Sequence, residues 1–106
     1  MVRVALARPV TLVAIRALGP TLTGFGISNF LADPLLELHD ANGTIITTND
    51  NWQDTQAADI QASGFAPSKP SESVILTTLT PAGYTAIVRG VGNTIGVGLV
   101  EVYTLN

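Results

Sequence analysis

Residues 73–90 read SVILTTLTPAGYTAIVRG, and this stretch decides the fold class. Its outer segments, 73–79 and 84–90, are rich in Val, Ile, Thr and Tyr, and the segment TPAG at 80–83 lies between them. β-Branched and aromatic residues favour the half-buried surface of a sheet, whereas Pro and Gly are typical of turns. The stretch therefore predicts two β-strands joined by a turn.

The rest of the chain has the same character. Val, Ile and Thr make up 31 of its 106 residues, and ten Gly and six Pro interrupt it at short intervals. Alternating apolar residues predict further strands at 2–8, 11–18 and 95–105, and only 54–62 favours a helical turn or two. The sequence thus predicts an all-β fold in one domain, residues 1–106. We expect a two-sheet antiparallel β-sandwich of about seven strands, jelly-roll or immunoglobulin-like.

The sequence DANG at 40–43 predicts a hairpin whose loop length sets the pairing of its strands. A two-residue turn would place Leu38 opposite Thr47. A three-residue loop with a left-handed Gly43 would place Leu38 opposite Ile46 instead. We expect the second register because it pairs apolar residues with each other.

A second hairpin is predicted near the C-terminus. The Gly-Asn pair at 92–93 suits a type II′ turn. This turn would pair Val88 with Val97 and Ala86 with Leu99. All four side chains are then expected to point between the two sheets.

The ends of the sandwich must be closed by side chains from loops. The stretch 19–34 has no strand or helix period, and we expect it to cap one end of the core with Leu22, Phe25, Ile27 and Phe30. Trp52, the single Trp, is expected to plug an end of the core, although an exposed Trp would stack on a sugar ring. Tyr84 follows Pro-Ala-Gly and resembles a corner tyrosine whose hydroxyl binds nearby backbone.

The chain carries five distinctive motifs: IRALGP (15–20), LADPLLEL (31–38), DANG (40–43), NDNW (49–52) and AGYTAIVRG (82–90). Together they resemble a β-sandwich module of large secreted bacterial proteins. That module is similar in plan to the bacterial pre-peptidase C-terminal domains, and the resemblance covers residues 12–105. The resemblance implies secretion, an extracellular or cell-surface location and a non-catalytic role.

Composition excludes several functional classes. The net charge of −3 argues against a nucleic-acid partner and against a polybasic membrane patch. The absence of Cys excludes disulfides, Cys-based zinc sites and a thiol nucleophile. No apolar run approaches the about 18 residues of a membrane span, and no signal peptide pattern precedes the predicted fold. We expect either a mature chain or a module excised from a longer one.

The acidic loop 49–54 is the best candidate for a metal site. Calcium takes about six to eight oxygen ligands, and the loop could supply part of that shell. Asp33 or Asp59 would have to complete the site. Alternatively, Asn and Asp side chains in such a loop cap turns and accept backbone hydrogen bonds. The candidate calcium ligands are Asn49, Asp50, Asn51 and Asp54.

The chain does not carry the residues of an enzyme. His39 is its only histidine and lies beside Glu37 at strand spacing, on a face that we expect to meet solvent. A catalytic triad would need a nucleophile arranged around that base. No Gly-x-Ser-x-Gly elbow and no complete dinucleotide-binding glycine motif is present. We therefore expect no catalysis and no cofactor other than calcium.

Two functional hypotheses remain. In the first, the chain is an extracellular structural or adhesion module that packs against neighbouring proteins or against copies of itself. Its N-terminal strand, within residues 1–10, carries Val2, Val4 and Leu6 on one face. That strand forms either an ordinary edge of its own sheet or completes a neighbour's sheet, which repeated head to tail would give a filament.

The second hypothesis is a calcium-assisted module that binds polysaccharide through Asp50, Asp54 and Trp52. An exposed Trp52 with further aromatic side chains on the same face would favour it. The chain has only six aromatic residues in total, and the core needs several of them. The first hypothesis is therefore preferred.

Overall fold

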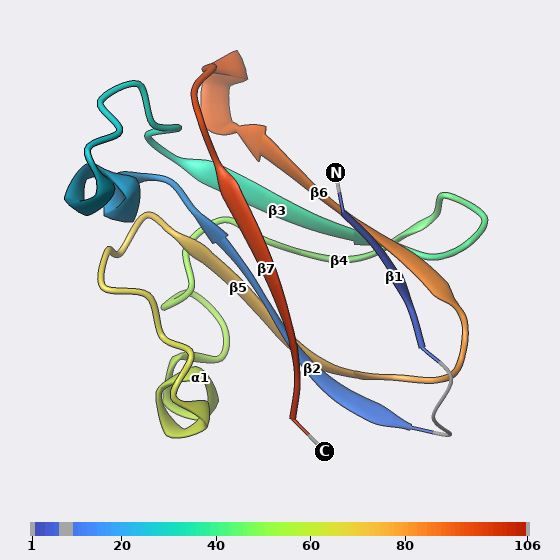
Figure 1. Ribbon diagram of the computed structural model, residues 1–106. Coiled ribbons are helices and arrows are strands. Elements are labelled where there is room, and N and C mark those ends of the chain that lie inside the picture. Colours follow the sequence, from blue (N-terminus) through green and yellow to red (C-terminus); the bar gives the residue numbers. More distant parts are fainter. Residues whose placement is uncertain (1, 7–9, 106) are drawn as a thin grey trace.

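The computed structural model describes residues 2–6 and 10–105, which form two antiparallel sheets packed face to face (Figure 1). The predicted β-sandwich is confirmed. Its strands are β1 (Val2–Ala5), β2 (Thr11–Leu18), β3 (Pro34–His39), β4 (Ile45–Asn49), β5 (Ser73–Leu79), β6 (Gly83–Gly90) and β7 (Leu99–Thr104). The helices are η1 (Pro20–Phe25), α1 (Ala57–Ser63) and η2 (Val91–Asn93). The four-stranded sheet has the order β1-β6-β3-β4 and the three-stranded sheet the order β5-β2-β7.

Strand β2 is the centre of the three-stranded sheet. Its alternation places Val13, Ile15 and Ala17 in the core and Arg16 on the outer face. Facing them from the other sheet are Leu36, Leu38, Tyr84 and Ala86. This apolar layer between the sheets supplies most of the hydrophobic stabilisation of the fold.

The predicted corner tyrosine lies at the start of β6, just after the turn from β5. The Tyr84 hydroxyl donates a hydrogen bond of 2.7 Å to the carbonyl oxygen of Thr80. Tyr84 is buried, so the bond satisfies a hydroxyl that would otherwise be desolvated without a partner. The prediction is confirmed.

The predicted C-terminal hairpin is wrong, because β6 and β7 lie in different sheets. Val88 pairs with Leu36 of β3, and Leu99 pairs with Leu18 of β2. Leu99 is 42% exposed and Val97 is also exposed, so neither points into the core as expected.

Backbone hydrogen bonds explain this change of sheet. The Val97 N–H donates to the Asn29 carbonyl and the Val97 carbonyl accepts from Leu31, at 2.8 and 2.7 Å. A Cβ on Gly96 would lie 2.6 Å from the carbonyl oxygen of Phe30, so only Gly permits this approach. The chain preceding β7 therefore pairs with residues 29–31 instead of returning along β6.

The loop of the β3–β4 hairpin has the expected conformation. Gly43 has a φ of +84°, and its N–H donates to the Asp40 carbonyl at 3.0 Å. The Asp40 N–H in turn donates to the Thr44 carbonyl at 2.9 Å. This is the predicted three-residue loop with a left-handed glycine.

The predicted register beyond that loop is wrong. A second irregularity between Leu38 and His39 shifts the ladder, so that Leu38 pairs with Thr47 and His39 with Ile45. The bulge leaves Ile46 without the expected partner and turns both isoleucines toward solvent. Local apolar matching therefore did not determine the register.

Candidate functional site

The acidic loop begins with an asparagine that stabilises the fold. Asn49 is buried at the end of β4, and its Oδ1 accepts the Val74 N–H of β5 at 3.0 Å. Its Nδ2 donates to the Asn51 carbonyl at 3.1 Å. The Asn49 amide therefore joins the edges of the two sheets, in agreement with the backbone-binding alternative.

Two carboxyl groups approach each other at this end of the four-stranded sheet. One oxygen of Asp33 and one of Asp50 are buried without a hydrogen-bond partner in the described part of the chain. Burial raises the pKa of Asp50, and the neighbouring carboxyl groups of Asp33 and Asp54 raise this pKa further. Among residues 2–6 and 10–105, however, no three His, Cys, Asp or Glu side chains form a metal-binding group.

Trp52 is 5% exposed and packs against Ile60 of α1 and Val74 of β5. The burial confirms the prediction of a core plug and removes Trp52 as a platform for a sugar ring or a partner. Helix α1 begins three residues later than the predicted segment and ends at a left-handed Gly64. Together these residues close the side of the sandwich where β4 meets β5.

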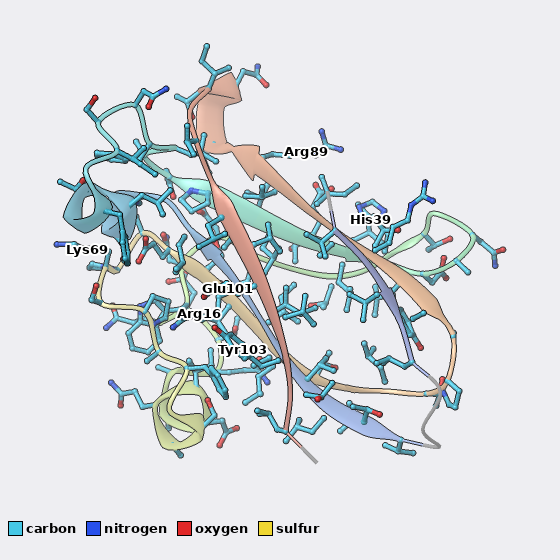
Figure 2. The ribbon with its side chains drawn as sticks, viewed as in Figure 1. Arg16, His39, Lys69, Arg89, Glu101 and Tyr103 are labelled. Carbon is cyan, nitrogen blue, oxygen red and sulfur yellow. The ribbon has the colours of Figure 1, made fainter. Side chains whose placement is uncertain are left out.

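A charged cluster lies on the outer face of the four-stranded sheet, where Figure 2 labels His39 and Arg89. Glu37 Oε1 accepts from His39 Nε2 at 3.0 Å and from Arg89 Nε at 3.2 Å. His39 Nδ1 lies 3.1 Å from the Gly43 carbonyl, so both ring nitrogens face acceptors. Only the imidazolium can donate both bonds, and the Gly43 carbonyl and Glu37 raise the pKa of His39.

This cluster is an ion-pair network. The same bonds from His39 and Arg89 lower the pKa of Glu37. The two ring nitrogens of His39 bond to the Gly43 carbonyl and to Glu37, so among the described residues no Ser or Thr hydroxyl is paired with this imidazole. Strand alternation places Glu37 and His39 on one face, as predicted.

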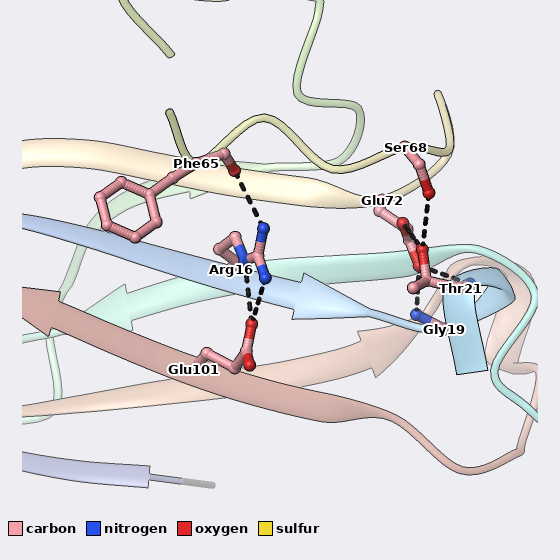
Figure 3. Close-up of polar contacts among 7 residues, drawn as sticks. All are labelled: Arg16, Gly19, Thr21, Phe65, Ser68, Glu72 and Glu101. Atoms are coloured by element: carbon pink, nitrogen blue, oxygen red, sulfur yellow. Dashed lines mark hydrogen bonds and ion pairs between the residues drawn. The ribbon is translucent and has the colours of Figure 1, made fainter. Parts of the chain in front are cut away.

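Glu72 is a residue whose role the sequence analysis missed (Figure 3). It is fully buried, and its Oε2 accepts the N–H groups of Gly19 and Thr21 at 2.9 and 2.8 Å. Its Oε1 accepts the Thr21 hydroxyl at 2.5 Å. These bonds satisfy donors at the start of η1, which has no side-chain cap of its own. The sequence does contain one signal for this role. The helix start at Gly19-Pro20 has no capping residue, so its N–H groups need an acceptor from elsewhere in the chain.

The outer face of the three-stranded sheet is covered by an Arg–aromatic cluster. Arg16 donates to Glu101 Oε1 from Nε and Nη2, at 2.9 and 2.6 Å (Figure 3). Its guanidinium lies 5.8 Å from the ring centroid of Tyr103, which stacks on Phe65 at 4.5 Å. The loop that carries Phe65 therefore packs on this face.

One end of the sandwich carries an apolar groove of about 260 Å³ with no charged residue in its lining. We call this the apolar groove; it is lined by Leu22, Phe25, Ile27, Val97, Gly98 and Leu99. Leu22 is buried as expected, but Phe25 is 75% exposed, so the prediction that Phe25 caps the core is wrong. Two residues before Val97 in the sequence, Ile95 is 93% exposed. Exposed apolar side chains gathered in this way are typical of interaction sites.

The N-terminal strand is an edge of the four-stranded sheet. Strand β1 pairs with β6 of its own chain, and Val2, Val4 and Leu6 are only partly buried where they pack on the core. The strand was predicted over 2–8; residues 7 and 8 lie outside the described residues.

Comparisons with protein-family models, curated proteins and solved structures gave no match for this chain. None of the helices in the described ranges has the length and apolar character required to span a membrane.

Proposed function

We propose that this chain is a non-catalytic structural module of the extracellular space or cell surface that works by packing against other proteins. The supporting observation is the apolar groove, where Phe25, Val97 and Leu99 are exposed around the buried Leu22. Removing such side chains from water on contact with a second protein surface is favourable by about 25 cal/mol per Å². The location is proposed from the resemblance of the sequence motifs to secreted modules.

Low charge supports the same proposal. Charged residues make up 12% of the chain, about half the usual share, and its mean hydropathy is +0.38. Monomeric proteins rely on surface charge to remain apart in solution. A chain with this composition therefore gains from covering part of its surface.

The test compares two exposed apolar positions in the full chain. Phe25→Ser changes the groove, and Ile45→Ser changes an exposed residue of β4 outside it. Both side chains are exposed, so neither variant is expected to unfold the protein. We expect Phe25→Ser to weaken self-association in sedimentation experiments by about tenfold or more, and Ile45→Ser to leave it unchanged. A wild-type chain that stays monomeric up to about 1 mM would contradict packing between copies.

The alternative of a calcium-assisted polysaccharide module has weaker support. Its aromatic platform, Trp52, is buried. The approach of Asp33 and Asp50 is the one observation that favours a cation at this loop. The Asp50→Asn experiment in the Discussion tests it.

A further inference from the structure

Strand β1 is attached more weakly than the central strands. None of its four residues is buried, whereas six of the eight residues of β2 are. Within its sheet, β1 pairs only with β6. The paired residues are Val2–Ala86, Arg3–Thr85, Val4–Tyr84 and Ala5–Gly83. A short edge strand with a single neighbour is the element of a sandwich that opens at the lowest free-energy cost.

The edge of β6 that β1 covers fits one type of occupant. Tyr84 and Ala86 belong to the buried core, and they lie directly opposite Val4 and Val2 on the neighbouring strand. An occupant must therefore be an extended strand with small apolar side chains two residues apart. Every copy of this chain carries that strand at its N-terminus, so a second copy fits the site in the same register.

Charge favours the same occupant. Residues 1–10 carry two arginines and no acidic residue, whereas residues 11–106 carry three basic and eight acidic residues. Residues 1–10 are thus basic in an otherwise acidic chain, and opposite charges favour encounter between copies.

We propose that β1 is exchanged between copies, the first strand of one chain pairing with β6 of the next. This inference rests on the proposed function and names the partner as a second copy. Exchange replaces the contacts within a chain by identical contacts between chains, so its free-energy cost is low. The β1 strand of the same chain competes for pairing with β6 at an effective concentration of the order of mM. Exchange should therefore appear when the protein concentration approaches about 1 mM. Repeated head to tail, it gives an open filament.

The experiment uses the full chain, which has no Cys of its own. Arg3→Cys and Thr85→Cys are prepared as separate variants, since these residues are Cα partners across β1 and β6. They are mixed at about 1 mM under oxidising conditions and linked pairs are identified by mass. The matched control mixes Arg3→Cys with Asp59→Cys, an exposed position on α1. The three substituted residues are at least partly exposed, so the fold should be retained.

We expect the Arg3→Cys/Thr85→Cys mixture to give at least several times more mixed dimer than the control mixture. A double variant carrying both substitutions should form a ladder of linked oligomers at high concentration and a closed monomer at low concentration. Equal yields in the two mixtures, or a double variant that closes only within one chain, would overturn the exchange.

The outcome separates this inference from the proposed function. If the register-specific link is absent while association still depends on Phe25, exchange fails and packing through the apolar groove stands. If the link forms and Phe25→Ser has no effect, the strand and not the groove joins the copies. If neither occurs, both proposals fail.

Discussion

The sandwich has two sides, and on each side an edge strand of one sheet meets an edge strand of the other. These two sides are closed to different degrees. On the β4–β5 side, Asn49 bonds the Val74 N–H, Gln56 bonds the Leu76 carbonyl, and Trp52 lies buried behind them. On the β1–β7 side, the side chains that pack on the core are only partly buried; they are Val2, Val4, Leu6, Val100 and Val102. Side chains that occupy strand edges on the first side block pairing with another chain. The proposed exchange of β1 takes place on the second side.

The closed side should be the more sensitive to truncation. Trp52→Ala removes the largest side chain of its cluster from a site that is 5% exposed, and we expect a loss of about 3–5 kcal/mol in the free energy of unfolding. Urea unfolding of wild type and Trp52→Ala measures this loss. Phe25→Ala is the control, with an expected loss within about 0.5 kcal/mol because its side chain is exposed. Equal losses would show that Trp52 does not close the core.

The same substitution on each side tests the comparison directly. Val74 is buried on β5, whereas Val102 is partly buried on β7. Val74→Ala should cost about 2–3 kcal/mol, because it removes two methyl groups and leaves a cavity. Val102→Ala should cost about 1 kcal/mol, because water or a partner can fill the space. A larger loss at Val102 in dilute monomer would mean that the β1–β7 side is the better packed one.

Local patterns predicted those parts of the fold that depend on neighbours in sequence. The strands at 11–18 and 73–79 were predicted with their observed bounds, since alternation and flanking turn residues are local signals. The path after β6 could not be predicted, because it depends on the bonds of Val97 to residues 29–31. The Leu38 register failed for a similar reason, a bulge with no turn residue to mark it.

The candidate site was predicted less completely than the fold. Asp50 was named from its loop, and Asp33 was one of two residues proposed to complete the site; these two carboxyls do approach each other. Glu72 was missed because its partners, Gly19 and Thr21, lie about fifty residues away in the sequence. Hydrogen bonds across such separations leave no periodic signal in a single sequence.

The Asp33–Asp50 pair predicts a pH-dependent stability at the edge of the closed side. Because the pKa of Asp50 is raised above its ordinary value of 3.8, the folded state binds its proton more tightly than the unfolded state does. Stability therefore falls as the pH rises through the raised pKa of Asp50, and the Asp50 carboxylate is unfavourable at pH 7. Asp50→Asn should raise the Tm at pH 7, and the gain should vanish below pH 3.8.

Calcium separates the two interpretations of this pair. If Asp33 and Asp50 hold the ion, saturating calcium at 100 times Kd adds about 2.7 kcal/mol to the wild type and nothing to Asp50→Asn. Melting curves recorded with a chelator and then with calcium decide the question. Identical wild-type curves would remove both the metal and the polysaccharide hypothesis that depends on it.

The smallest effect is expected at His39, on the outer face away from both sides of the sandwich. Its pKa is raised above 6.5 by the Gly43 carbonyl and by Glu37, so protonation favours the folded state. The stabilisation is complete below pH 6.5 and is lost as the pH rises through the raised value. The difference in Tm between wild type and His39→Ala should therefore be largest at low pH and should shrink under alkaline conditions. This difference in Tm should remain smaller at every pH than the difference between wild type and Val102→Ala. The reason is that the hydrogen bonds of His39 lie at the surface and are screened by water. A difference that grows with pH would mean that His39 stabilises the fold as the neutral imidazole.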